Sequence, residues 1–165
     1  MTTPDEDIVR VLARQVIMTL EMTHSTLAVA ESSTGGLIGH LLTEVEGCSA
    51  VYFGGTIAYA NQLKEKLGVP RDMLDKYGAV SPEVAAAMAR GVRDQAGAGI
   101  GLAVTGIAGP NGGTPAKPAG LTYIALADET RVTNEVHRFS GERARNKLRS
   151  AEMALQLVQK HLMEM

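Results

Sequence analysis

The chain has 165 residues, of which 45% are hydrophobic and 21% are charged, and its formal net charge is −2. These values are typical of one globular domain, and the small charge excludes the basic surface of a nucleic-acid-binding protein. No apolar run approaches the roughly 20 residues that a membrane-spanning helix needs. The acidic start is unlike a signal peptide, and the single cysteine cannot form an internal disulfide. We therefore expect a cytoplasmic protein that binds neither nucleic acid nor membranes.

The first half of the chain predicts alternating helices and strands. A helix from Pro4 to about His24 begins with a proline and three acids, and one apolar face is expected to consist of Ile8, Val11, Leu12, Val16 and Leu20. The patterns that follow predict a strand at 26–30, a helix at about 35–43, a turn at 46–49, a strand at 51–59, and short helices at 61–67 and 71–77. Inside the second strand, Gly54–Gly55 indicates a bulge or a close backbone approach.

The second half begins with a strong helix start. Ser81-Pro82-Glu83 combines a cap, a proline at the first helical position and an acid. That helix is expected to run to about residue 95, followed by a strand at 99–105, a long Gly/Pro-rich loop at 105–120, a hairpin of strands 121–127 and 131–139, and a closing helix at 143–163. We therefore predict a single α/β domain over residues 1–165, a three-layer α/β/α sandwich with a mixed sheet.

The stretch from Thr26 to Gly36 places three hydroxyl residues where a strand passes into a helix. Ser32, Ser33 and Thr34 follow the apolar strand and precede Gly35–Gly36. Such a position exposes side chains at a sheet edge and leaves backbone N–H groups free to hold an anion or a developing oxyanion. The alternative is that the hydroxyls only cap the helix and the glycines only turn the chain.

Other familiar chemistries find little support. The four histidines are scattered without partners at ligand spacing, so we expect no metal, and a Ser-His-Asp triad also lacks support. Neither Gly-rich stretch matches a known phosphate-binding motif, although backbone N–H groups in Ser33–Gly36 or Gly106–Gly113 could hold a phosphate. A serine without histidine can be activated by a lysine that burial keeps neutral. Lys64 is such a candidate, with Tyr59 relaying a proton or holding the amine; the alternative is a solvated lysine and a packing tyrosine.

Four segments together resemble the CinA C-terminal domain family: A-E-S-S-T-G-G at 30–36, the stretch from Tyr59 to Lys64, G-A-V-S at 78–81, and A-V-T-G-I-A-G-P-N-G-G-T-P-A-K-P-A-G at 103–120. The resemblance covers nearly the whole chain in order. Stand-alone members of that family are nicotinamide-nucleotide amidases, which convert nicotinamide mononucleotide to nicotinate mononucleotide and ammonia. We expect these 165 residues not to include the family's companion domain, which is similar to molybdopterin-binding proteins.

The resemblance implies roles for individual residues. Ser32 matches the nucleophile, Lys64 its base and Tyr59 the partner of that base. The implied substrate-binding residues are Ser33, Thr34, Gly35, Ser49, Thr105, Gly106, Gly109, Gly112 and Arg143, the last of which suits a phosphate. Many members have a cysteine where this chain has Ser33, so that cysteine cannot be a required nucleophile here. Glu31 is expected to orient its neighbours.

The implied activity needs no cofactor, and its only ligand is a small nucleotide. The resemblance also suggests a homodimer or a larger assembly. A competing hypothesis is a non-catalytic nucleotide-binding module of the competence and damage-inducible type, and another is hydrolysis of a different small amide. The presence of the serine, the tyrosine and the lysine favours an enzyme.

Overall fold

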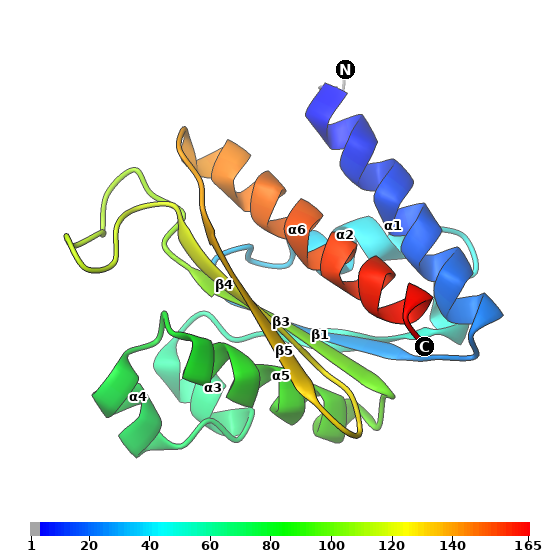
Figure 1. The fold of residues 1–165 in the computed structure, drawn as a ribbon, viewed down its shortest axis with the longest axis horizontal. Coiled ribbons are helices and arrows are strands. Elements are labelled where there is room, and N and C mark those ends of the chain that lie inside the picture. Colours follow the sequence, from blue (N-terminus) through cyan, green and yellow to red (C-terminus); the bar gives the residue numbers. More distant parts are fainter. Residues whose placement is uncertain (1–3) are drawn as a thin grey trace.

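The computed structural model describes residues 4–165 as one α/β unit (Figure 1). In chain order its elements are α1 (Pro4–Met22), β1 (Leu27–Glu31), α2 (Leu37–Thr43), the 3-10 turn η1 (Cys48–Ala50), β2 (Tyr52–Ile57), α3 (Asn61–Lys66), α4 (Arg71–Tyr77), α5 (Pro82–Ala96), β3 (Ile100–Gly106), β4 (Leu121–Ala127), β5 (Val132–Arg138) and α6 (Arg143–Met163).

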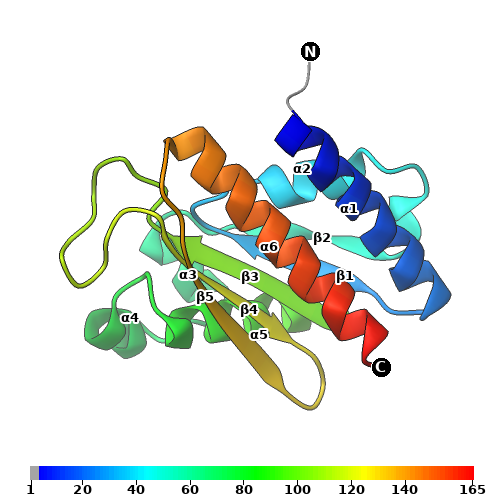
Figure 2. The ribbon, with the colours of Figure 1, turned by 45° about the horizontal axis from the view of Figure 1, so that its top comes forward.

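The five strands form one mixed sheet in the order β2-β1-β3-β4-β5. β1 is parallel to both β2 and β3, whereas the β3–β4 and β4–β5 pairs are antiparallel. Helices α1, α2 and α6 cover one face and α3, α4 and α5 the other, as Figures 1 and 2 show. The three-layer sandwich with a mixed sheet is therefore confirmed.

Each face of the sheet has its own hydrophobic core. Large aliphatic residues such as Leu20 and Leu155 fill the layer under α1 and α6. The layer under α5 is built mainly from small residues, including Ala89 and Ala103, and this composition lets α5 approach the sheet closely. A methyl group at Gly101 of β3 would lie 2.0 Å from the carbonyl oxygen of Ala89 in α5. Substitution of this glycine would therefore push the helix off the sheet.

Most of the predicted elements are confirmed, with ends that differ by a few residues. The Ser81 side chain accepts a hydrogen bond from the N–H of Val84 and caps α5 as expected. Directly before the glycine pair, between Tyr52 and Gly54, the register of β2 with β1 shifts by one residue, and Gly54 has a φ of 112°, which confirms the bulge.

One prediction for α1 is wrong. Val16 and Leu20 are buried as expected, but Ile8 and Val11 are more than half exposed, because Val9, Ala13 and Ile17 complete the buried face instead. Both stripes are apolar, so the periodicity alone could not identify the inner one. Within residues 4–165, no helix is long and apolar enough to cross a membrane.

Candidate active site

The ends of the parallel strands bring the predicted site residues together. Ser32 directly follows β1, Lys64 comes shortly after β2, and Thr105 lies at the end of β3. β1 and β3 are neighbours in the sheet, and the connection that leaves β1 goes to β2 on one side whereas the connection that leaves β3 goes to β4 on the other. Ligands bind in open α/β sheets at such a switch point, beyond the carboxyl ends of the strands. β5 runs parallel to β3, so the start of α6, with Arg143, reaches the same edge.

A cavity of about 460 Å³ opens at this edge. Nine of the twelve predicted site residues line it, namely Ser32, Ser33, Tyr59, Lys64, Thr105, Gly106, Gly109, Gly112 and Arg143. The long loop between β3 and β4 forms one wall and projects from the body of the molecule (Figure 1). The cavity is thus built from the segments that the sequence analysis singled out.

The centre of the cavity is a contact between a serine and a lysine. The Nζ of Lys64 lies 3.1 Å from the Oγ of Ser32. The same Nζ lies 2.7 Å from the carbonyl oxygen of Ala58 and 3.0 Å from that of Tyr59, and donates a hydrogen bond to each. A neutral amine has two N–H bonds and one lone pair, and the two carbonyls accept the two N–H groups. The remaining direction faces Ser32, so a neutral Lys64 can accept the serine proton.

Burial makes the neutral form of Lys64 accessible near neutral pH. Lys64 is only 1% exposed, and among residues 4–165 the partners of its amine are two carbonyls and a hydroxyl, with no carboxylate. Desolvation therefore lowers the pKa of Lys64 from 10.5 to about 8. The prediction that this lysine is buried beside Ser32 holds, and the alternative of a solvated lysine is wrong.

Glu31 ends β1, and its carboxylate lies at the start of α2. Its carboxylate accepts hydrogen bonds from the backbone N–H groups of Gly36, Ile38 and Gly39 at 3.0, 3.1 and 2.8 Å. Glu31 therefore orients its neighbours, as expected. The consequence is that the N-terminus of α2 already holds an anion and is closed to a ligand.

Two backbone donors next to Ser32 stay available. The N–H of Gly35 donates to the carbonyl oxygen of Ser32, whereas the N–H groups of Ser33 and Thr34 donate to no atom of residues 4–165. The Oγ of Ser33 and the Oγ1 of Thr34 are also buried without hydrogen-bond partners in that range. Of these two residues Ser33 lines the cavity, so an oxygen atom held over Ser32 would find a backbone donor there.

The backbone carbonyl of Tyr59 accepts a hydrogen bond from Lys64, and its phenol accepts one from Arg143. Tyr59 as a residue is 62% exposed, and its phenol oxygen accepts a 3.4 Å hydrogen bond from Arg143. Arg143 also donates to the carbonyl oxygen of Gly109 at 3.2 Å. Within the described part of the chain the phenol has no contact with the lysine amine. Of the two predicted roles for Tyr59, the geometry fits holding the amine rather than relaying a proton.

Thr105 links two segments of the cavity lining, the end of β3 and the stretch before α5. It is fully buried, and its hydroxyl donates to the carbonyl oxygen of Ala79 at 2.8 Å. Five further lining residues received no predicted role: Ala79, Val80, Ile107, Ala108 and Asn111. All five lie inside segments of the family resemblance, so that resemblance was the available signal.

Three predicted substrate-binding residues do not line the cavity. Thr34 is fully buried, and the N–H of Gly35 is already bonded to Ser32. Ser49 is exposed in η1, directly before β2. Since β1 and β2 are parallel, a residue before β2 lies at the opposite end of the sheet from Ser32, which follows β1. The assignment of Ser49 to the site of its own chain is therefore wrong.

The described residues contain no group of three or more His, Cys, Asp or Glu side chains that could hold a metal ion. What the site offers is a hydroxyl, a buried amine, the backbone N–H of Ser33 and an arginine at the rim. This set can activate an oxygen nucleophile and stabilise an oxyanion.

Fold and site together define a three-layer α/β protein with a serine–lysine pair at the carboxyl ends of its parallel strands. The model of the CinA C-terminal domain matches residues 9–162, and the chain belongs to this family. A CinA-like protein of Acidobacterium capsulatum is 46% identical over 153 residues, which are 92% of this chain and 37% of the relative. A CinA-like protein of Geobacter sulfurreducens is 50% identical over 139 residues, 84% of this chain and 34% of the relative.

The chain thus spans about a third of the length of these curated relatives. Among solved structures, the competence/damage inducible protein CihA of Agrobacterium tumefaciens has a TM-score of 0.91 and 36% sequence identity, with 98% of both chains covered. A CinA superfamily protein of Escherichia coli has a TM-score of 0.89 and 31% identity, and the alignment covers 97% of this chain and 94% of that one.

Proposed function

We propose that this protein is an amidohydrolase that converts nicotinamide mononucleotide to nicotinate mononucleotide and ammonia. The observation that carries the proposal is the buried amine of Lys64, 3.1 Å from the Ser32 hydroxyl, with its pKa lowered to about 8. A base with a pKa near the working pH combines a useful neutral fraction with sufficient basicity. The substrate class follows from the family resemblance and from the arginine at the rim of the cavity.

In the acylation step neutral Lys64 takes the proton of the Ser32 hydroxyl as Oγ attacks the carboxamide carbon. The carbonyl oxygen becomes an oxyanion, which the free backbone N–H of Ser33, a residue of the cavity lining, stabilises. The protonated Lys64 then gives its proton to the carboxamide nitrogen, the C–N bond breaks, and ammonia leaves. The product of this step is an ester between Ser32 and the nicotinoyl group.

The deacylation step repeats the proton transfers with water in place of the serine. Lys64, again neutral, takes a proton from a water molecule, which attacks the ester carbon. The ester bond breaks, Ser32 regains its proton from Lys64, and nicotinate mononucleotide is released. The carbonyls of Ala58 and Tyr59 stay bonded to the lysine throughout and hold its amine toward Ser32.

The glycine-rich loop and Arg143 supply the site for the ribose phosphate. Gly109 and Gly112 line the cavity, and both have a positive φ, which favours glycine and opens backbone groups toward a ligand. Arg143 presents its guanidinium at the rim, where it can bind a phosphate in a bidentate manner. Binding energy from the phosphate would orient the carboxamide over Ser32.

The test is to measure ammonia release from nicotinamide mononucleotide by the wild type, Ser32→Ala and Ser33→Ala. Loss of the nucleophile should lower kcat by about 10³-fold or more, with unchanged thermal unfolding. The matched Ser33→Ala variant keeps the backbone N–H and leaves the Ser32–Lys64 pair in place, so its kcat should stay well above that of Ser32→Ala. Near wild-type activity in Ser32→Ala would refute the assignment. Tight calorimetric binding of the nucleotide without ammonia release by the wild type would instead indicate a nucleotide-binding module.

A further inference from the structure

Four buried side-chain polar atoms of residues 4–165 have no hydrogen-bond partner in that range. Two of them are the hydroxyl oxygens of Ser33 and Thr34, next to the proposed nucleophile. The other two are the amide oxygens of Asn146 and Gln159, both in α6. Buried polar atoms usually have partners, so an unpartnered amide oxygen directs attention to what the other half of the amide holds.

The side-chain amide of Asn146 links the glycine-rich loop to the start of α6. Asn146 is buried in the first turn of that helix. Its Nδ2 donates to the carbonyl oxygen of Ala108 at 3.0 Å and to that of Gly141 at 3.2 Å. Carbonyl oxygens only accept hydrogen bonds, so the NH₂ group must face them and the amide oxygen must face away. One NH₂ group therefore connects a residue of the cavity lining to the segment that leads into α6.

Asn146 lies on the same side of α6 as Arg143. The two residues are three positions apart, which makes them neighbours on the helix surface. Arg143 donates to the carbonyl oxygen of Gly109 at 3.2 Å, and Gly109 directly follows Ala108. A Cβ atom placed at Gly109 would lie 3.9 Å from the Nδ2 of Asn146. The amide thus sets the separation between the loop glycines and the guanidinium, the two parts of the proposed phosphate site.

The helix end of this link is itself connected to the sheet. Ser150, one turn after Asn146, donates from its Oγ to the carbonyl oxygen of Asn146 at 2.8 Å. The same Oγ lies 3.3 Å from the Oγ1 of Thr122 in β4, and all three residues are buried. A series of buried hydrogen bonds therefore runs from β4 through α6 to the loop. Satisfied polar networks of this kind make the relative positions of the elements rigid.

We propose that Asn146 is a positioning residue, whose amide holds Arg143 and the glycine-rich loop at the separation that binds a phosphate. This role rests on the proposed amidase function. Asn146 does not belong to the cavity lining, so it acts through the loop and Arg143 rather than by contact with the ligand. Its loss should therefore affect the phosphate-bearing substrate far more than the same molecule without its phosphate, nicotinamide riboside.

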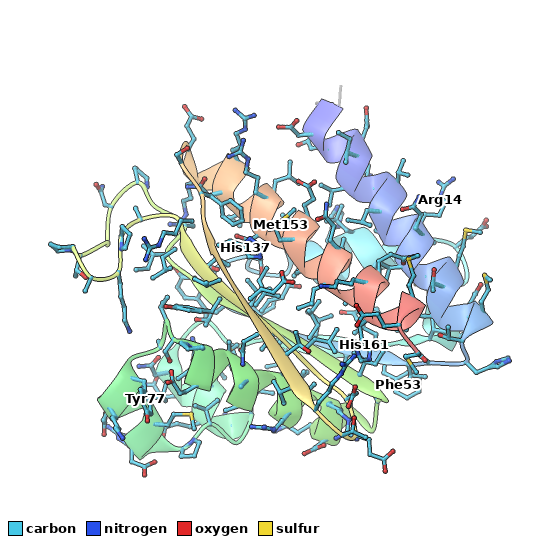
Figure 3. All side chains as sticks on the ribbon, viewed as in Figure 1. Arg14, Phe53, Tyr77, His137, Met153 and His161 are labelled. Atoms are coloured by element: carbon cyan, nitrogen blue, oxygen red, sulfur yellow. The ribbon has the colours of Figure 1, made fainter. Side chains whose placement is uncertain are left out.

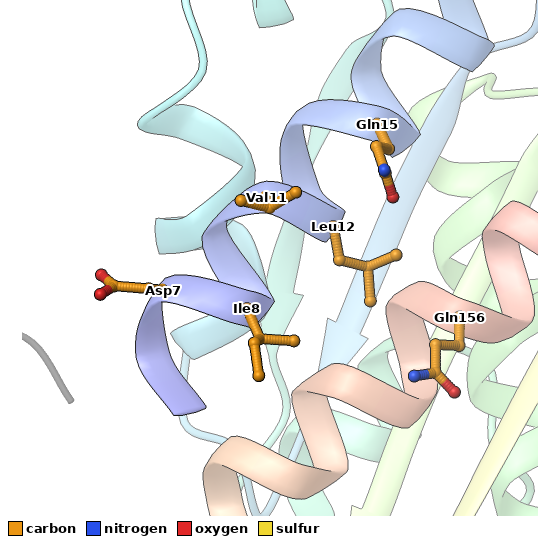
Figure 4. Close-up of a pocket in the computed structure, with 6 residues that line it drawn as sticks. All are labelled: Asp7, Ile8, Val11, Leu12, Gln15 and Gln156. Carbon is orange, nitrogen blue, oxygen red and sulfur yellow. The ribbon is translucent and has the colours of Figure 1, made fainter. Parts of the chain in front are cut away.

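Gln159 provides a matched control on the same helix. Its Nε2 donates to the Oγ1 of Thr19 in α1 at 3.1 Å, and its amide oxygen is buried without a partner, like that of Asn146. Figure 4 shows Gln156, one turn earlier in α6, facing α1. Figure 3 labels His161, two residues after Gln159, at the end of α6 away from the loop. Removal of either amide deletes the same chemical group from α6, but only that of Asn146 contacts the cavity wall.

A second side chain holds the loop from its other side. The Nζ of Lys117 donates to the carbonyl oxygen of Tyr77 at 2.6 Å, at the end of α4. Figure 3 labels Tyr77 on this helix, beneath the projecting loop. If general order of the loop decided phosphate binding, loss of this contact would act in the same way as loss of the Asn146 amide.

The test compares kcat/KM for nicotinamide mononucleotide and for nicotinamide riboside in Asn146→Leu, Gln159→Leu and Lys117→Met. Leucine has nearly the size of asparagine and removes the two donors and the unpartnered oxygen together, so Asn146→Leu is expected to fold, which thermal unfolding checks. In this variant the ratio of the mononucleotide value to the riboside value should fall about tenfold, mainly through KM of the mononucleotide. The two controls should keep this ratio within about twofold of the wild type.

An unchanged ratio in folded Asn146→Leu would overturn the positioning role, and so would an equal fall of the ratio in either control. Asn146→Asp repeats the test if the leucine variant does not fold. Aspartate keeps the size of asparagine but turns a carboxylate toward two carbonyl oxygens, so it also loses both donors. The ratio should fall in this variant as well.

Hydrogen exchange measured by mass spectrometry separates this inference from the amidase proposal. Backbone amides of residues 107–113 should exchange at least about fivefold faster in Asn146→Leu than in the wild type and in Gln159→Leu. Unchanged exchange would overturn the inference even in an active enzyme. Absence of ammonia release from the wild type would refute the amidase proposal, and the exchange rates would still decide whether Asn146 holds the loop.

Discussion

Two buried charged residues lie near the end of β1, and their surroundings differ in a way that separates structure from function. Glu31 is surrounded by three backbone N–H donors, which satisfy its carboxylate and fix the start of α2. Lys64 is equally buried, but among residues 4–165 the hydrogen-bond partners of its amine are two carbonyls and one hydroxyl, and its pKa falls to about 8. The carboxylate of Glu31 is fixed by its hydrogen bonds, whereas the amine of Lys64 can gain and lose a proton near neutral pH.

This difference follows from the alternation of a strand. Glu31 belongs to β1, and its side chain lies on the face of the sheet that α2 covers. Ser32 is the next residue, so its side chain points toward the other face of the sheet. There it contacts Lys64, which follows β2 in the chain. Adjacent residues in the sequence thus serve two unrelated purposes. The carboxylate of Glu31 stabilises the start of α2, and the hydroxyl of Ser32 is the proposed nucleophile.

The largest effect is expected from removal of the amine. Lys64→Met should lower kcat for ammonia release by about 10³-fold or more, because Ser32 then has no base. Its secondary structure and α2 contacts should persist, since Met fills a similar volume. Addition of external amines to Lys64→Ala provides the control, because partial rescue reports lost base chemistry rather than a damaged fold.

Lys64→Met should also lack the pH dependence of the free energy of unfolding that the buried amine gives the wild type. The folded pKa of Lys64 is depressed from 10.5 to about 8, so the unfolded chain binds more protons between these two values. The wild type should therefore gain stability as the pH rises from 8 toward 10, up to roughly 3 kcal/mol in total from this residue. Urea unfolding at several pH values measures this gain. An identical pH dependence in Lys64→Met would contradict the burial of a titrating amine.

A smaller effect, and one on stability, is expected from Glu31→Gln. The amide keeps one acceptor oxygen but turns an NH₂ group toward backbone N–H donors at the start of α2. The free energy of unfolding should fall by about 1–3 kcal/mol. At 25 °C kcat should change by less than about tenfold, as measured on protein that is fully folded. A loss of activity as large as that of Lys64→Met would mean that Glu31 takes part in the chemistry.

The smallest effect is expected from Tyr59→Phe. The backbone carbonyl that holds Lys64 is unchanged in this variant, and only the 3.4 Å contact with Arg143 is lost. KM should rise by a few-fold at most while kcat stays near the wild-type value. A hundredfold fall of kcat would instead indicate that the phenol relays a proton, which is the other role that the sequence analysis considered for Tyr59.

Local patterns in the sequence predicted the elements well where caps and composition agreed. The Ser81-Pro82 start of α5 and the hairpin about Asp128 are both present. The stripe on α1 was assigned partly to the wrong face, because apolar residues line both sides of that helix. A helix that is apolar on two sides needs the tertiary structure to decide which side is inward.

The candidate site was predictable in part, for reasons of geometry. Ser32, Lys64 and Thr105 all follow or end strands that are parallel, so their convergence depends on strand direction. The same rule excludes Ser49 from that edge, because it precedes its strand. The resemblance gave the residues but not the burial of Lys64, since burial depends on how α3 packs under the sheet. No pattern in the sequence reports this packing.

The most direct test of the central claim is the titration of the Lys64 amine itself. Protein with ¹³C-labelled lysine side chains reports each amine by its Cε chemical shift, and the Lys64→Met variant identifies the Lys64 signal. The account predicts a midpoint near pH 8 for this signal. A midpoint near 10.5, the value of a solvated lysine, would leave Ser32 without a neutral base at physiological pH and contradict the account.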